Sequence, residues 1–110
     1  KWELLVSATT VRVPVIYGHS VSVYAEFENE VDIPKVEKTL QNSPRIVYYP
    51  NTYITPLDLG SSNETHICRL RLGTDEKSLT FWNVGHNVRL GAAANAVNIL
   101  ITHSKYSGRL

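Results

Sequence analysis

A chain of 110 residues with 43% hydrophobic residues is large enough to form one domain with its own core. The formal net charge is only +1 and the basic residues are scattered, so we expect neither nucleic acid nor a membrane surface as a partner. No apolar run reaches the roughly 18 residues that a membrane span needs. The single cysteine favours a reducing, cytoplasmic compartment.

Alternating and β-branched residues predict strands, and apolar residues at helical spacing predict two helices. The expected elements are a strand over 3–15, a strand over 21–27, a helix opened by Asp32 and ended by Ser43, a short strand over 45–49, a loop over 50–63, strands over 65–72 and 78–84, and a helix over 88–103. The strands follow one another without regular βαβ alternation. We therefore predict a single α+β domain over 1–110, with a mixed, largely antiparallel sheet and the helices packed on one side.

The strand over 65–72 contains the only cysteine. Strict alternation would place Cys68 on one face and both Arg69 and Arg71 on the other. Cys68 has no predicted cation or helix N-terminus beside it, so we interpret it as a buried structural thiol rather than a nucleophile. His66 and His103 lack partners at the spacing of metal ligands, and no metal site is predicted.

The stretch VRVPVIYGHS combines a fixed cation, a rigid proline, a flexible glycine and an imidazole within ten residues. Arg12 can hold a carboxylate or phosphate with two hydrogen bonds, and His19 can exchange a proton near neutral pH. Their spacing would put them on opposite faces of an unbroken strand, but Pro14 and Gly18 permit a turn between them. The alternatives are a surface ion pair for Arg12 and a histidine bonded to the backbone for His19.

Four segments together resemble the C-terminal half of aspartate-semialdehyde dehydrogenases: VRVPVIYGHS, YITPLD, RLRLG and HNVRLGAAANAVNIL. The resemblance implies a fold like the C-terminal domain of glyceraldehyde-3-phosphate dehydrogenase. It also implies that His19 is the acid/base residue, that Arg12 binds the substrate carboxylate, and that Asn95 lies near the nicotinamide of NADP. Two positions depart from the family pattern, because His86 replaces an acidic residue and Leu90 replaces a lysine.

The resemblance also implies a reaction. Enzymes of this family reductively dephosphorylate aspartyl phosphate to aspartate semialdehyde through a thioester on a cysteine. This chain has no G-x-G-x-x-G turn, and its cysteine lies in a different context from that nucleophile. We therefore expect it to be a segment or remnant that lacks the nucleotide-binding half and is inactive alone. The alternatives are the related N-acetyl-glutamyl-phosphate reductase and a non-catalytic dimerisation module.

The resemblance further implies a homodimer or larger homo-oligomer. Aromatic residues are numerous for such short strands, and we expect some of them to cover a sheet face against a second subunit. The aromatic residues in question are Tyr48, Tyr49, Tyr53, Phe81 and Trp82.

Overall fold

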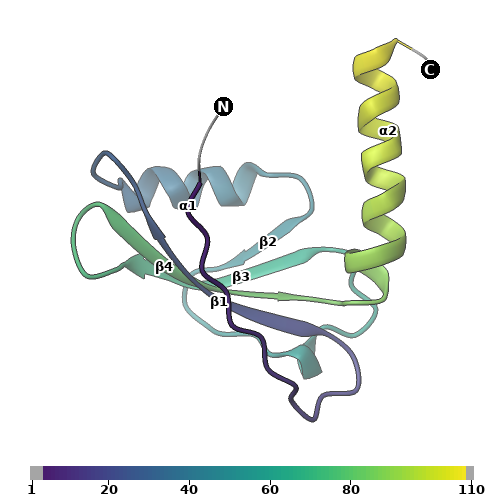
Figure 1. The fold of residues 1–110 in the computed structure, drawn as a ribbon, viewed down its shortest axis with the longest axis horizontal. Coiled ribbons are helices and arrows are strands. Elements are labelled where there is room, and N and C mark those ends of the chain that lie inside the picture. Colours follow the sequence, from purple (N-terminus) through teal and green to yellow (C-terminus); the bar gives the residue numbers. More distant parts are fainter. Residues whose placement is uncertain (1–3, 109–110) are drawn as a thin grey trace.

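The computed structural model describes residues 4–108 (Figure 1). Its elements are β1 (His19–Glu26), α1 (Ile33–Asn42), β2 (Ile46–Tyr49), the short 3-10 helix η1 (Pro56–Asp58), β3 (Thr65–Leu72), β4 (Ser78–Gly85), the π-helix η2 (Arg89–Ala94) and α2 (Asn95–Ser107). The strands form one sheet in the order β1-β4-β3-β2, in which only the β2–β3 pair is parallel. The predicted α+β class with a mixed, largely antiparallel sheet is confirmed.

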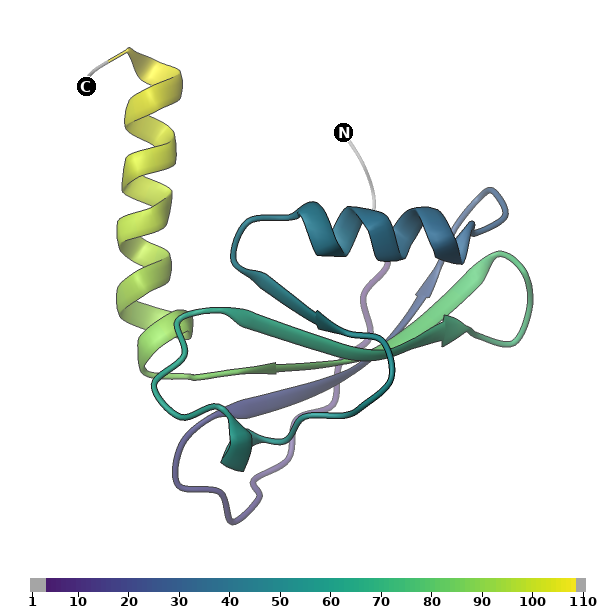
Figure 2. The same ribbon diagram turned by 180° about the vertical axis from the view of Figure 1, so that it is seen from behind.

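The two faces of the sheet are covered differently, as Figures 1 and 2 show. Helix α1 packs over β2 and β3 on one face. The loop over 50–63, which carries η1, crosses the other face. It inserts Ile54 and Leu59 against Cys68 and Val84 of the sheet to form the hydrophobic core. The long loop is therefore part of the packed structure rather than a loose connection.

The start and end of α1 agree with the sequence prediction. The Asp32 carboxylate accepts a hydrogen bond from the Lys35 backbone N–H at 3.1 Å, and a proline lies in the first turn. Tyr48 on β2 donates its hydroxyl to Glu37 of α1 at 2.7 Å. Burial and this neighbouring carboxylate raise the pKa of Tyr48 to about 12.

Strand β3 departs from strict alternation after Cys68. Cys68 lies opposite Trp82 and Arg71 opposite Thr80, so β3 has one residue more than β4 between these pairs. The extra residue is accommodated by Arg69, whose φ is 58°. Arg71 therefore lies on the same face as Cys68, and the prediction that placed it on the opposite face is wrong.

The strand predicted over 3–15 is not formed. Residue 3 lies outside the described part of the chain, and residues 4–15 run extended without strand pairing. A β-prone sequence becomes a strand only beside a neighbour that takes its hydrogen bonds, and Pro14 also lacks a donor. The apolar side chains of this segment consequently lie in solvent; Leu5 is 96% exposed.

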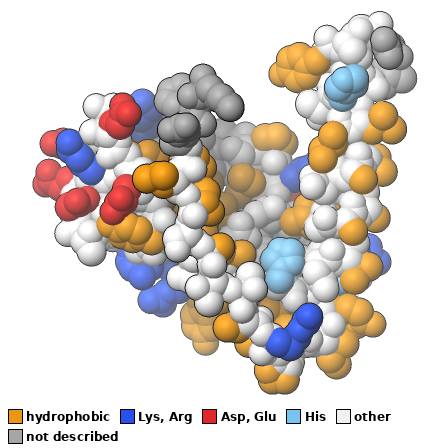
Figure 3. Space-filling view, viewed as in Figure 1, with side chains coloured by type: hydrophobic (Ala, Val, Ile, Leu, Met, Phe, Trp, Pro, Cys, Tyr) orange, Lys and Arg blue, Asp and Glu red, His pale blue; other side chains and the backbone are white. Residues whose placement is uncertain are grey.

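The last predicted helix forms as two consecutive elements, η2 and α2. Helix α2 leaves the end of the sheet and stands away from the rest of the domain (Figures 1 and 2). Figure 3 shows apolar side chains spaced along it, and Val97, Ile99 and Leu100 are each more than half exposed. In the described range 4–108, no helix has both the length and the hydropathy to cross a bilayer.

The aromatic side chains expected to cover a sheet face against a second subunit mostly pack within the chain. Tyr49 and Trp82 pack against the core, and Tyr48 is bound to α1. Phe81 is half-buried, whereas Tyr53 is 69% exposed. Most other exposed apolar side chains lie in the segment before β1, on β1 and on α2, and Leu57 of η1 and Leu72 of β3 are exposed as well.

Candidate functional site

The turn before β1 brings three separated sequence motifs into contact at Gly18. Its N–H donates to the Asn87 side-chain oxygen at 2.9 Å. Its φ is +95°, and a Cβ at this position would lie 2.9 Å from Leu59 Cδ1 and 3.0 Å from Pro56 Cβ. Only glycine combines that backbone conformation with so close an approach. The YGHS, TPLD and HNV segments therefore meet at one point.

This contact predicts a sharp difference between two glycines. Gly18→Ala should lower the free energy of unfolding by about 2 to 4 kcal/mol, because left-handed backbone strain adds to overpacking. Gly60→Ala is the matched control, since Gly60 has φ +53° and no atom within 4 Å of the added Cβ. We expect it to cost only about 1 kcal/mol. Urea denaturation measures both; equal losses would show that Gly18 is not packed as described.

The TPLD segment is fixed by hydrogen bonds of its own. Asp58 accepts from both the backbone N–H and the hydroxyl of Thr55, each at 2.7 Å. These bonds hold the pKa of the Asp58 carboxyl below its usual range. Asp58 thus caps the short turn Pro56–Asp58, and this turn places Pro56 and Leu59 next to Gly18.

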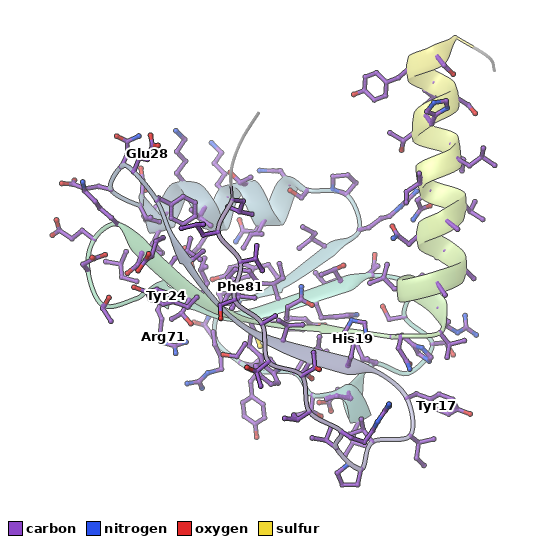
Figure 4. All side chains as sticks on the ribbon, in the orientation of Figure 1. Tyr17, His19, Tyr24, Glu28, Arg71 and Phe81 are labelled. Atoms are coloured by element: carbon purple, nitrogen blue, oxygen red, sulfur yellow. The ribbon has the colours of Figure 1, made fainter. Side chains whose placement is uncertain are left out.

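His19 is the first residue of β1 and pairs with Gly85 at the end of β4. A Cβ on Gly85 would lie 3.5 Å from His19 Nε2, and one on Gly91 would lie 3.7 Å from His19 Cε1. The imidazole thus rests between two glycines, one ending β4 and one in η2. Figure 4 shows it beside the foot of α2. Its side chain is exposed, so it is accessible for proton exchange with a bound molecule.

Gly91 belongs to η2, the first part of the last helix, and an added Cβ there would touch the His19 ring at ordinary van der Waals distance. The helix is widened here to a π-helix, a form that is common at functional sites.

His86 is buried beside this site and organises the start of η2. Its ring stacks on Tyr17, with centroids 5.6 Å apart and an interplanar angle of 26°. Its Nδ1 accepts a hydrogen bond from the Arg89 backbone N–H at 3.4 Å, and its carbonyl accepts from Leu90 at 2.9 Å. Sequence reasoning noted His86 only as a departure from the family pattern and passed over Tyr17 and Asn87. All three residues are next to the YGHS or HNV motif in the sequence, and this position could have marked them as candidate site residues.

The other two predicted site residues lie apart from this contact cluster. Arg12 lies in the extended segment before the turn, and its side chain is exposed. Within residues 4–108, no hydrogen bond connects Arg12 to His19. Asn95 begins α2, one turn beyond Gly91, and its side chain is also exposed. A shallow groove follows this face of the helix and is lined by Asn95, Asn98, Ile99, Thr102, His103 and Tyr106.

Cys68 is fully buried in the hydrophobic core, which confirms the predicted position of the thiol. Across the described residues, no three histidine, cysteine or acidic side chains are grouped as metal ligands.

Comparison with known proteins identifies relatives of this chain. A family model described as "Semialdehyde dehydrogenase, dimerisation domain" matches residues 2–90. The aspartate-semialdehyde dehydrogenase of Campylobacter jejuni is 40% identical over 102 residues, a match covering 88% of this chain and 30% of that protein. The enzyme of Aquifex aeolicus is 38% identical over 102 residues, with the same two coverages.

Solved structures show the same fold. The aspartate semialdehyde dehydrogenase II of Vibrio cholerae, complexed with ASA, superposes with a TM-score of 0.76 at 33% identity. The match covers 81% of this chain and 27% of the Vibrio cholerae chain. A probable aspartate-semialdehyde dehydrogenase from Pseudomonas aeruginosa superposes with a TM-score of 0.73 at 36% identity, covering 82% of this chain and 29% of its own. The chain spans less than a third of the length of the curated relatives it matches. It belongs to the family of semialdehyde dehydrogenase dimerisation domains.

Proposed function

We propose that this chain is the substrate-binding and dimerisation part of an NADP-dependent enzyme that reductively dephosphorylates aspartyl phosphate to aspartate semialdehyde. The observation that carries the proposal is the meeting of three motifs at the Gly18–His19 turn, which leaves an exposed imidazole between two glycines. The names of the similar proteins support this reaction. We assign the step to amino-acid biosynthesis in the cytoplasm, where a lone reduced thiol such as Cys68 is usual.

In this proposal His19 is the general acid and base. It takes the proton from the attacking thiol, which the rest of the enzyme supplies. It then accepts and donates protons at the tetrahedral intermediate. An exposed imidazole, unencumbered by bulk on either glycine, suits this task. Arg12 pairs with the substrate carboxylate through its planar fork, and its exposed position leaves that fork accessible.

The face of α2 that continues from Gly91 fits a nicotinamide group. Asn95, Asn98 and Thr102 line its groove, and their amide and hydroxyl groups match the donors and acceptors of a carboxamide. NADP, when bound, supplies hydride transfer. Asn95 would orient the nicotinamide, while most of the cofactor would be held by a nucleotide-binding half beyond these 110 residues.

The reaction is tested in the whole enzyme that contains this chain. We expect NADP reduction that requires both aspartate semialdehyde and inorganic phosphate. Comparable kcat/KM with N-acetylglutamate semialdehyde would instead assign the chain to the related N-acetyl-glutamyl-phosphate reductase. A folded protein without activity on either substrate would leave a non-catalytic dimerisation module.

We also expect the chain to associate with itself. The family description names dimerisation. The segment before β1 exposes three consecutive apolar side chains, Leu4, Leu5 and Val6. Contiguous apolar surface of this kind usually marks an interface. Sedimentation should show a dimer or larger assembly, and a strictly monomeric profile at high concentration would contradict this expectation.

A further inference from the structure

A buried histidine outside the site described above joins the 50–63 loop to the sheet. His66 on β3 is only 6% exposed. Its Nδ1 lies 3.1 Å from the Tyr49 hydroxyl and its Nε2 lies 2.7 Å from the Ser62 hydroxyl. The Tyr49 and His66 rings are also stacked, with centroids 5.9 Å apart. The imidazole therefore bridges β2 and the end of the loop.

The surroundings of His66 favour its neutral form. Burial lowers its pKa from the usual value, and the charge of Glu64 opposes this effect in part. The groups that face it are the Tyr49 hydroxyl from β2 and the Ser62 hydroxyl from the loop, while β4 contributes the apolar Val84 as its pairing partner. Because the folded pKa is below the unfolded one, the stability that His66 contributes is complete above the ordinary histidine pKa. It is lost as the pH falls from that value through the folded pKa.

The bridge continues from Ser62 to the candidate site. The Ser62 N–H donates to the Leu59 carbonyl at 3.0 Å, and Leu59 Cδ1 is the atom nearest to where a Cβ on Gly18 would lie. Gly18 immediately precedes His19. A second bond, from Trp82 Nε1 to the Ile54 carbonyl at 3.2 Å, fixes the other half of the loop. The loop is thus attached at both ends, and His66 holds the end that carries Leu59.

We propose that His66 is a positioning residue for His19: neutral His66 holds Ser62, the 50–63 loop stays seated on the sheet, and Leu59 keeps the Gly18–His19 turn in place. Protonation of His66 loosens this end of the loop and lets the turn move. Only the final step, from the turn to proton transfer, rests on the proposed function.

Hydrogen exchange on the intact protein tests the attachment without any assay of activity. Protection factors of the Gly18 and Ser62 amides are compared between about pH 7.5 and about pH 5, a range that spans the ordinary histidine pKa. We expect both to fall severalfold at the lower pH. The amides of α1, on the other face of the sheet, should hold their protection and report global stability.

Two variants separate His66 from the other histidines. His66→Gln keeps hydrogen-bonding groups but cannot titrate, and His66→Phe keeps a ring on Tyr49 without a proton to gain. In both, the fall at Gly18 and Ser62 should disappear. Persistence of the fall in either folded variant would overturn the proposal, as would an equal fall in α1. A response at Ser62 that does not reach Gly18 would overturn it as well.

The catalytic step is read separately in the whole enzyme. Over the same pH range, kcat of the native enzyme should fall by more than kcat of His66→Gln. If exchange responds as expected but the two kcat profiles coincide, His66 does not position His19 for catalysis. An enzyme without the proposed activity, by contrast, would leave the exchange result standing and would contradict only the assigned reaction.

Discussion

Replacing His19 by Asn is expected to lower turnover by roughly two to four orders of magnitude, the range for loss of general acid-base catalysis. Asn preserves approximate size and one hydrogen bond but cannot take a proton near neutral pH. Because the side chain is exposed between two glycines, the substitution removes no buried contact, and stability should change little. The limb of the pH–rate profile that reports the imidazole should vanish with the activity.

Lys38→Asn is the control for this measurement. Lys38 is also an exposed titratable side chain, but it lies on α1, which packs over β2 and β3 and takes no part in the candidate site. We expect its turnover and pH profile to remain near those of the parent. Near-parental turnover in His19→Asn, or a loss of activity explained by unfolding, would contradict the catalytic role of His19. The GHS motif would then be only a turn and the start of a strand.

Arg12→Lys is expected to lower kcat/KM for aspartate semialdehyde by about 30- to 150-fold, equivalent to about 2 to 3 kcal/mol of transition-state binding. Lysine keeps the charge but loses the planar fork that holds a carboxylate with two hydrogen bonds. Folding should be nearly unaffected, because Arg12 is exposed in a segment without strand pairing.

The loss of kcat/KM in Arg12→Lys should depend on whether the substrate carries a carboxylate. For an aldehyde that lacks the carboxylate, the loss in Arg12→Lys should shrink, because the missing fork then has nothing to hold. Arg45→Lys, at an exposed position between α1 and β2, serves as the control and should leave both substrates unchanged. Equal losses for the two substrates would show that Arg12 acts on structure rather than on substrate.

The elements that could be predicted are those whose signals are local. The Asp32 cap, the alternating strand over 21–27 and the strand over 78–84 depend on residues close together in the chain, and each forms as expected. The family resemblance brought out His19 for the same reason, since its motif is contiguous. The meeting of that motif with Asn87 and Leu59 depends on tertiary packing, which no local pattern encodes.

The predictions that were wrong, or that missed a residue, also failed because they depend on tertiary packing. The apolar segment before β1 has strand propensity, but within residues 4–108 nothing pairs with it. The reversal of Arg71 follows from a bulge at Arg69, a residue with no sequence signal for left-handed backbone. His66 was excluded as a metal ligand on spacing alone. Its partners Tyr49 and Ser62 come from a neighbouring strand and from the end of a long loop, and only the folded chain brings them together.

The most direct test is to graft this chain into the aspartate-semialdehyde dehydrogenase of Campylobacter jejuni. Residues 4–103 would replace the matching segment of the Campylobacter jejuni relative, and NADP reduction would be measured with aspartate semialdehyde and phosphate. We expect an active graft whose turnover depends on His19 and whose selectivity for a carboxylate-bearing aldehyde depends on Arg12. A folded, dimeric graft without activity, or one whose activity survives His19→Asn, would contradict it.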